Sequence, residues 1–401
     1  MLKQILTKEW DKVSYQTLGL NQEHAKKFQK FLEEKQLTHA LDFGLEGITT
    51  CAHVGIIRFA DFQLNILPKI IGEEDSLCLE NLMFMLRYTR KLEIHSMDSA
   101  EISQTKQPFL EVLIAHYANI LLNALQRHIP HQYETQEDNL PTVKGRILFA
   151  KNHLVNAANL ARTYCQFDEF TPDNLLNQTL KFVSQALQKL TSVSQTRQKL
   201  LKINAVYEDV TLRPVAYAET QKIILNRNHT MFKEPLELAQ MFLQNSTSSL
   251  HNHTFSNLAI LFDMNKLFEE FVATALEQAF PGQVKIQNKL KIIEDIDGIP
   301  GTSYTIRPDI LFGKDTIIDT KYKRLSLPED KPSEADIYQM LAYAKFYRMK
   351  NIILCYPRYQ QHYNHATVLE DKNCSITLLT IDLHQKLTET YLQRIFYESF
   401  N

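Results

Sequence analysis

Cysteine is scarce in this sequence and never occurs in a closely spaced pair. The 401 residues contain five cysteines, an odd number, and no CxxC motif. A disulfide framework needs paired cysteines and a structural zinc site needs ligands at short, fixed spacings, so neither is expected. Scattered reduced thiols are typical of a protein that stays in the cytoplasm.

Net charge is small, and a phosphate-binding glycine loop is missing. Lys and Arg number 44 against 46 Asp and Glu, which gives a net charge of −2 at pH 7. This balance excludes a chain that coats nucleic acid by its overall charge, so any DNA contact needs a local patch or a partner. Because no GxxxxGK(S/T) motif occurs, any motor driven by a nucleoside triphosphate must be another chain.

Long hydrophobic runs are also missing. The first residues, MLKQILTKEWDKVSYQ, mix charged side chains among apolar ones, which a signal peptide does not do. The most apolar stretch, FLEVLIAHYANILLNALQ, carries Glu111, His116 and Asn119 and predicts a buried amphipathic helix. We therefore expect a soluble, cytoplasmic protein with no membrane partner.

The patterns that are present divide the chain into two parts. Residues 38–71 alternate between apolar and polar side chains with glycines between them, which predicts strands, and the spacing becomes helical from about residue 76. The polar stretch QNSTSSLHNHTFS, residues 244–256, is the best linker candidate. We expect an N-terminal module of residues 1–250, β-rich to about 75 and then mainly helical, and a C-terminal domain of residues 256–401.

The elements after the linker follow an α-β-β-β-α-β order. A helix is predicted at 257–280, strands near 284–293, a hairpin at 306–322, a second helix at 334–349 and a strand at 351–356. This order is typical of a mixed sheet flanked by helices. The predicted fold class is α+β, with an α/β C-terminal domain.

The stretch RPDILFGKDTIIDTKYK, residues 307–323, predicts a hairpin with two carboxylates face to face. A three-residue turn centred on Lys314 places Asp309 opposite Asp319, with Cβ atoms about 5 Å apart. Two carboxylates so close repel unless a cation lies between them or one is protonated. Lys321 lies two residues after Asp319 and therefore points to the same side of the sheet.

Two aspartates and a lysine on one strand pair suit metal-assisted attack of water on a phosphodiester. Mg²⁺ prefers one or two carboxylates plus waters and phosphate oxygens. The metal lowers the pKa of water and neutralises charge that develops on the phosphate. The alternative is a solvated hairpin in which Lys321 forms a surface ion pair with either aspartate, and the hairpin residues alone leave both interpretations open.

The two helices of the C-terminal domain offer further side chains to such a site. In the first, Glu269 falls at the edge of the apolar stripe, where a buried carboxylate would need a metal or a basic partner. The alternative is a helix-edge side chain that reaches water. In the second, Gln339 and Tyr343 lie four residues apart on one face. Gln339 would hold a phosphate, a water or Lys321, unless the two form an ordinary surface pair.

These residues carry a family resemblance. RPDILF and IIDTKYK, followed by DIYQMLAYA, resemble the PD-(D/E)xK nuclease core in its version with a QxxxY helix. Five other segments are similar to the McrC family, the nuclease subunit of McrBC-type, 5-methylcytosine or modification-dependent restriction systems: DMNKLFEEFV, VGIIRFADFQLNILPKI, LMFMLRYT, VKGRI and FDEFTPDNLLNQTLKFV. The resemblance extends from about residue 40 to 360.

The resemblance implies a restriction-endonuclease-like domain that cuts double-stranded DNA with Mg²⁺, for which Mn²⁺ would substitute. It implies that Asp309, Asp319 and Glu269 bind the metal and that Lys321 acts on the attacking water and the phosphate. Gln339 and Tyr343 would support the substrate side.

The resemblance also implies a partner, a hexameric McrB-like AAA+ GTPase that alone uses GTP. The N-terminal module would dock at the pore of that ring, and a fragment of residues 256–401 would fold without stimulating it. Two alternatives stay open. A non-cutting activator of a partner NTPase would still stimulate it after replacement of Asp309, Asp319 and Lys321. A self-sufficient repair-type nuclease would cut without any other protein.

Overall fold

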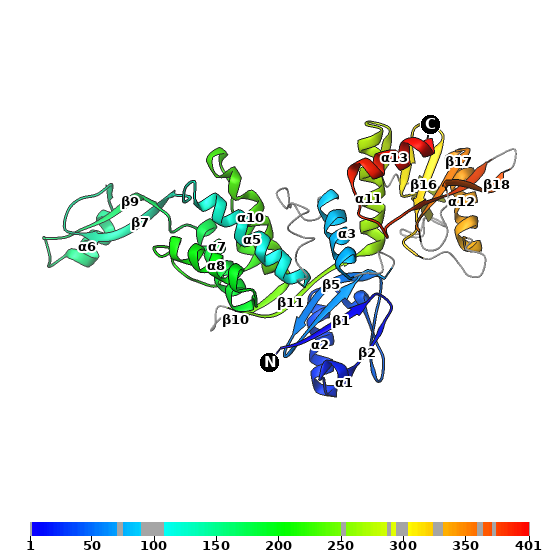
Figure 1. The fold of residues 1–401 in the computed structure, drawn as a ribbon. Helices are drawn as coiled ribbons and strands as arrows, with labels where there is room; N and C mark the ends of the chain where they lie inside the picture. The colour runs from blue at the N-terminus through cyan, green and yellow to red at the C-terminus, as the bar shows by residue number, and fades with distance from the viewer. Residues whose placement is uncertain are drawn as a thin grey trace. The chain divides into compact units, whose positions relative to one another are not determined.

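The computed structural model describes residues 2–69, 75–89, 108–249, 254–286, 290–293, 304–323, 332–358, 364–370 and 374–400. Two compact units are present (Figure 1). Unit 1 combines Met1–Phe109 with Ala259–Asn401, and unit 2 comprises Leu110–Leu258. The contacts thus group the β-rich start with the C-terminal domain. The predicted roles of the two parts, docking for residues 1–250 and DNA cleavage for residues 256–401, stay predictions.

The strands predicted between residues 38 and 71 are present in the N-terminal part of unit 1. The main sheet contains, in spatial order, β1 (Lys3–Lys8), β6 (Phe62–Leu67), β5 (His53–Phe59) and β11 (Thr254–Asp263). β1 runs parallel to β6, and β5 and β6 form an antiparallel hairpin. Gly55 lets β11 come close, because its φ is 134° and a Cβ there would lie 2.1 Å from the Ile260 carbonyl oxygen.

A smaller sheet and short helices complete this part. They are β2 (Lys12–Ser14), α1 (Tyr15–Leu18), α2 (Gln22–Glu34), the 3₁₀ helix η1 (Thr38–Ala40), β3 (Leu41–Phe43) and β4 (Gly47–Thr50). α2 begins after Asn21, whose side chain accepts a hydrogen bond from the His24 N–H. Its fully buried Phe28 contacts the rings of Phe59 and Phe62, at 5.2 and 5.4 Å between centroids. The hydrophobic core therefore lies between α2 and the main sheet.

The C-terminal part of unit 1 has a mixed six-stranded sheet, as predicted. Its strands in spatial order are β12 (Val284–Ile286), β15 (Ile310–Phe312), β16 (Thr316–Thr320), β17 (Asn351–Pro357), β19 (Ser375–Ile381) and β18 (Asn364–Glu370), and a separate pair joins β13 (Leu290–Ile293) to β14 (Tyr304–Ile306). β16, β17 and β19 are parallel, whereas β15 and β18 are antiparallel to their neighbours.

Helices cover both faces of this sheet. They are α11 (Met264–Ala279), α12 (Glu334–Tyr347) and α13 (Glu389–Phe400). The Phe280 ring, directly after α11, contacts Phe312 at 5.3 Å. The neighbouring Leu311 belongs instead to the core that includes Met340 of α12. Because adjacent strand residues point to opposite faces, α11 and α12 cover opposite sides. The α+β fold class is confirmed.

Helix α3 (Asp75–Tyr88) ties the N-terminal part of unit 1 to its C-terminal part. The Tyr88 ring contacts Phe271 of α11 at 5.5 Å between centroids. The buried Asn81 side chain donates hydrogen bonds to the carbonyl oxygens of Leu383 and Gln385, at 3.0 and 2.9 Å. These partners lie more than 300 residues away in the sequence, which no local pattern predicts.

Unit 2 is mainly helical, as expected for this stretch. Its helices are α5 (Phe109–Leu125), α6 (Phe149–Asn156), α7 (Leu175–Leu190), α8 (Ser194–Val206), α9 (Tyr217–Thr220), η2 (Arg227–Phe232) and α10 (Lys233–Gln244). α5 is the predicted amphipathic helix, and its buried Tyr117 donates a hydrogen bond to the Leu180 carbonyl. Within the described part of the chain, no helix is long and apolar enough to cross a membrane.

An arm of two long strands belongs to unit 2. β7 (Gln132–Leu140) pairs along its whole length with β9 (Thr163–Thr171), and β8 (Arg146–Ile147) adds to β9. We call residues 132–171 the arm. In Figure 1 the arm extends away from the helices of unit 2 and carries α6 at its far end. Within the segment VKGRI, only Arg146 and Ile147 form a strand.

The predicted linker at 244–256 is wrong where the structure describes it. β10 (Ser246–Ser249) pairs with the start of β11, with Ser246 opposite Leu258. The high content of serine and threonine predicted a linker. A pair of strands is held by backbone hydrogen bonds, however, and such strands tolerate these side chains. Residues 250–253 lie outside the described residues.

Candidate active site

One pocket in unit 1 brings together all six side chains that the sequence singles out. The pocket has a volume of about 310 Å³, and the predicted residues that line it are Glu269, Asp309, Asp319, Lys321, Gln339 and Tyr343. Six further residues that the sequence reasoning missed complete the lining: Asn265, Lys266, Arg307, Thr320, Tyr322 and Lys323. Helical spacing offered a signal for the first two, since residues three and four before Glu269 share its side of a helix.

The hairpin has the predicted register, and this places Asp309 at the end of β15. Phe312 pairs with Thr316 and Ile310 with Ile318, and Gly313 provides the left-handed turn residue with a φ of 61°. Asp309 lies just beyond the paired residues. Its Oδ2 accepts hydrogen bonds from the backbone N–H and the hydroxyl of Thr320, both at 2.7 Å. These bonds fix the carboxylate at the strand end.

Asp319 is a buried carboxylate next to one cation and one other acid. Only 1% of the residue is exposed, and its Oδ2 lies 2.6 Å from the Lys321 Nζ. Burial, together with the charge of Asp309, raises the pKa of Asp319 to about 7, and Lys321 opposes this shift. A solvated surface pair would not have such a pKa. One lysine therefore leaves part of the repulsion between the two aspartates uncompensated.

A chain of hydrogen bonds holds Lys321 in place. Its ammonium donates to the Gln339 Oε1 at 3.0 Å, and the Gln339 amide donates to the Tyr343 hydroxyl at 2.8 Å. That hydroxyl donates in turn to the Arg307 carbonyl at 3.2 Å. Burial, with a smaller contribution from Asp319, raises the pKa of Tyr343 to about 12. Three roles were expected for Gln339, and in the structure it has one of them, because its side chain holds Lys321.

Asp336 anchors the first turn of α12 beside the end of β16. The Lys323 ammonium lies 2.7 Å from its Oδ2, and the Tyr356 hydroxyl donates to the same oxygen at 3.0 Å. Burial alone would raise the pKa of Asp336, but hydrogen bonds from Lys323 and Ser333 hold it below its usual value. This anchor lies about one helical turn before Gln339 and holds the start of the helix that carries it.

Glu269 reaches the pocket from α11. The helix begins after Asp263, whose side chain accepts a hydrogen bond from the Asn265 N–H at 3.0 Å. The prediction of a helix from residue 257 is therefore wrong for residues 257–263, which belong to strand β11. A short apolar run fits a buried strand as well as a helix. Glu269 is half-buried, which agrees with the predicted position at the edge of the apolar stripe. Its role as a metal ligand stays a prediction.

The donor set of the pocket fits a hard cation that keeps some of its own waters. Asp309 and Asp319 provide carboxylate oxygens, and the hydrogen bonds and ion pair described above use only their Oδ2 atoms. In the part of the chain that the structure describes, both Oδ1 atoms therefore are available to a metal such as Mg²⁺, which needs only one or two carboxylates when phosphate oxygens and waters complete its shell. Among the described residues, no three His, Cys, Asp or Glu side chains are placed to hold a metal by themselves.

Two chains of solved structures share this fold. One belongs to the refined half-complex from the tetradecameric assembly of Thermococcus gammatolerans McrB AAA+ hexamers with bound McrC. Its TM-score is 0.79, with 17% identity over 98% of this chain and 99% of that chain. The other belongs to the cryo-EM structure of the Thermococcus gammatolerans McrBC complex, with a TM-score of 0.55 and 20% identity over 69% of this chain and 88% of that chain. No curated protein matches the chain.

The sequence also matches a protein family. The family is described as McrBC 5-methylcytosine restriction system component, and the match covers residues 48–357, well over half of the chain. All six predicted pocket residues fall within this range. The chain therefore belongs to the family of McrBC 5-methylcytosine restriction system components.

Proposed function

We propose that this chain is the DNA-cleaving subunit of an McrBC-type restriction system, acting with Mg²⁺ and with a AAA+ GTPase partner. One observation supports the proposal most directly. The buried Asp319, the nearby Asp309 and the held Lys321 lie in one open pocket. Acids with strongly raised pKa values cluster at functional sites. Family membership supports the restriction system as the setting.

The roles of the residues follow from their contacts. Lys321, held between Asp319 and Gln339, directs its ammonium group into the pocket. There it polarises the attacking water and offsets the negative charge that develops on the phosphate. Gln339 and Tyr343 keep this ammonium from turning away. Bound Mg²⁺, held by Asp309 and Asp319, would lower the pKa of a water and neutralise the phosphate.

A charge-removing substitution tests the proposal. Asp319→Asn should lower Mg²⁺-dependent cleavage of methylated duplex DNA by at least about 100-fold, measured with the partner GTPase and GTP present. Asp315→Asn is the matched control, because Asp315 lies at the turn of the same hairpin, away from the pocket lining. The control should cut normally, and both variants should still stimulate GTP hydrolysis. Normal cleavage by Asp319→Asn would contradict the proposal.

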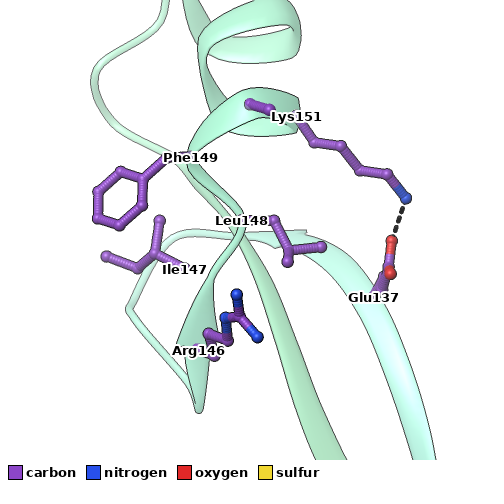
Figure 2. A pocket seen from close by; sticks show the side chains of 7 residues that line it. Glu137, Arg146, Ile147, Leu148, Phe149 and Lys151 are labelled. Atoms are coloured by element: carbon purple, nitrogen blue, oxygen red, sulfur yellow. Dashed lines mark hydrogen bonds and ion pairs between the residues drawn. The ribbon is translucent and has the colours of Figure 1, made fainter.

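The partner proposal is supported by the surface of the arm. Seven large apolar side chains are exposed on it: Tyr133, Val143, Phe149, Leu154, Val155, Leu160 and Phe170. A groove of about 700 Å³ on the arm is lined by Ile147, Phe149, Lys151 and Glu137, among others. Figure 2 shows Ile147 and Phe149 together on one side and the ion pair of Lys151 and Glu137 on the other. Exposed apolar clusters rimmed by charges mark protein interaction sites. The solved half-complex from Thermococcus gammatolerans contains McrB AAA+ hexamers with bound McrC, and we assign the arm to docking on such a ring.

A further inference from the structure

A buried carboxylate from the N-terminal part of unit 1 contacts the chain next to Lys321. Glu9, directly after β1, is completely buried, and its Oε2 accepts a hydrogen bond from the Tyr322 hydroxyl at 3.0 Å. The same oxygen accepts the Lys69 N–H at 2.9 Å. Glu9 and Tyr322 are 313 residues apart in the sequence, and the catalytic roles proposed above use neither of them.

Tyr322 is held on its other side by α11. Its ring lies 5.9 Å from the Phe268 ring, and Phe268 directly precedes Glu269. Only 4% of Tyr322 is exposed. The two neighbours of Tyr322 make other contacts, since the Lys321 N–H donates to the Cys355 carbonyl and Lys323 pairs with Asp336. Tyr322 therefore joins the end of the catalytic strand to β1, to the segment after β6 and to α11.

Packing alone does not explain this arrangement. A buried carboxylate is costly unless its hydrogen bonds are satisfied, and the Glu9 Oε1 has no hydrogen-bond partner among the described residues. Burial raises the pKa of Glu9 to about 7, although hydrogen bonds from Lys69 and Tyr322 lower it. An apolar residue would fill this place at lower cost. The contacts that Glu9 makes, and an apolar residue would not, are the hydrogen bonds from the Lys69 N–H and from the Tyr322 hydroxyl, and only the second reaches the chain next to Lys321.

We propose that Glu9 and Tyr322 form a clamp that positions Lys321, so that the N-terminal sheet is a working part of the active site. The inference rests on the proposed function. Tyr322 shares a peptide bond with Lys321, so rotation of an unclamped Tyr322 would shift the ammonium relative to Asp319 and Gln339. A displacement of about 1 Å at a reacting group costs about 100-fold in rate. Both residues act through Lys321 and are positioning residues.

Single and double substitutions in the full chain test the clamp. Tyr322→Phe keeps the ring on Phe268 and removes only the hydroxyl. It should lower kcat for DNA cleavage about tenfold and leave KM unchanged, because the substrate contacts stay. Glu9→Ala should have the same effect, and the double variant should be no worse than either single variant. Glu9→Gln keeps an oxygen acceptor and should retain most of the wild-type kcat.

A matched control separates positioning from general stability. Tyr88→Phe removes another buried hydroxyl, one that donates to Gln278 while the ring packs on Phe271 of the same helix α11. Its kcat should equal that of the wild type. The clamp is overturned if Tyr322→Phe keeps full kcat or if Tyr88→Phe loses as much.

A second measurement does not depend on cleavage, so it tells failure of the clamp from failure of the proposed function. Amide hydrogen exchange of the full chain reports the Lys321 N–H, which is bonded to the Cys355 carbonyl at 2.9 Å. Exchange in the peptide that covers residues 316–323 should become about tenfold faster in Glu9→Ala and Tyr322→Phe but not in Tyr88→Phe. Absence of cleavage by the wild type, with this exchange pattern present, would count against the proposed function only. Unchanged exchange would overturn the clamp.

Discussion

At the scale of single residues, Asp319 is the buried carboxylate of the candidate site. Its pKa of about 7 arises from burial and from Asp309, and Lys321 only partly offsets them. A metal ligand must be deprotonated. Under the proposed function, protons and Mg²⁺ should therefore compete for Asp319 near neutral pH.

This competition predicts a pH-dependent stabilisation by metal. Mg²⁺ should raise the melting temperature of the full chain more at pH 8 than at pH 6, because it binds only the folded state and binds the deprotonated pair. Each pH unit below about 7 should weaken binding about tenfold. Asp309→Asn keeps an acceptor for Thr320 but loses the charge, so its metal-induced shift should be small at both values.

Without metal, the stability contribution of Asp319 changes with pH in the opposite direction, and this provides an internal check. The folded pKa of Asp319 lies above its usual 3.8, so the folded state binds more protons than the unfolded state between about pH 4 and 7. Its contribution to stability is complete below this window and is lost as the pH rises through it. Equal Mg²⁺ shifts at pH 6 and 8, or in wild type and Asp309→Asn, would argue against metal binding at this pair. Asp315→Asn should behave as the wild type.

At the scale of elements, local patterns predicted the hairpin and the helix after it, whereas the helix before it was predicted from residue 257 and begins only at Met264. The turn and the period-2 alternation set the register of the hairpin. The spacing of two residues was therefore enough to predict that Asp319 and Lys321 lie on one face. The same holds for the Gln339–Tyr343 pair on α12. The polar composition of residues 246–249 predicted a linker, but these residues form a strand held by backbone pairing with β11. The Glu9–Tyr322 hydrogen bond could not be predicted from the sequence, because no local rule relates two residues that are 313 positions apart.

The arm yields a prediction at this same scale. Phe149→Ser combined with Leu154→Ser should lower stimulation of the partner GTPase at least tenfold, since exposed apolar side chains at the centre of an interface each contribute about 2 kcal/mol. Both side chains are more than three-quarters exposed, at 77% and 81%, so folding should not suffer. GTP turnover and thermal melting measure the two effects.

The matched control for the arm is Ile224→Ser. This residue is 85% exposed and belongs to unit 2 but lies outside the arm. It should stimulate as the wild type does. Full stimulation by the double variant would place the docking surface elsewhere.

At the scale of the whole molecule, the candidate active site belongs to a unit assembled from both ends of the chain. Asn81 bonds to residues near 385, Lys386 lies 2.5 Å from Glu80, and Glu9 bonds to Tyr322. A fragment of residues 256–401 loses all of these partners and exposes the part of α11 around Phe271 that packs on α3. The structure therefore indicates a different truncation from the fragment 256–401 that the sequence suggested.

The better dissection removes unit 2 and keeps unit 1 whole. The Phe109 and Phe262 rings lie 6.1 Å apart, so the ends left by deletion of residues 110–258 are close, and a short Gly/Ser linker spans them. This variant should melt in one cooperative transition and keep the slow amide exchange of residues 316–323. It should lose stimulation of the partner GTPase, because the arm is gone. The fragment 256–401 should instead lack a cooperative transition, since it lacks β1, β5, β6 and α3. Stimulation by the unit 2 deletion at the level of the full chain would show that docking resides in unit 1.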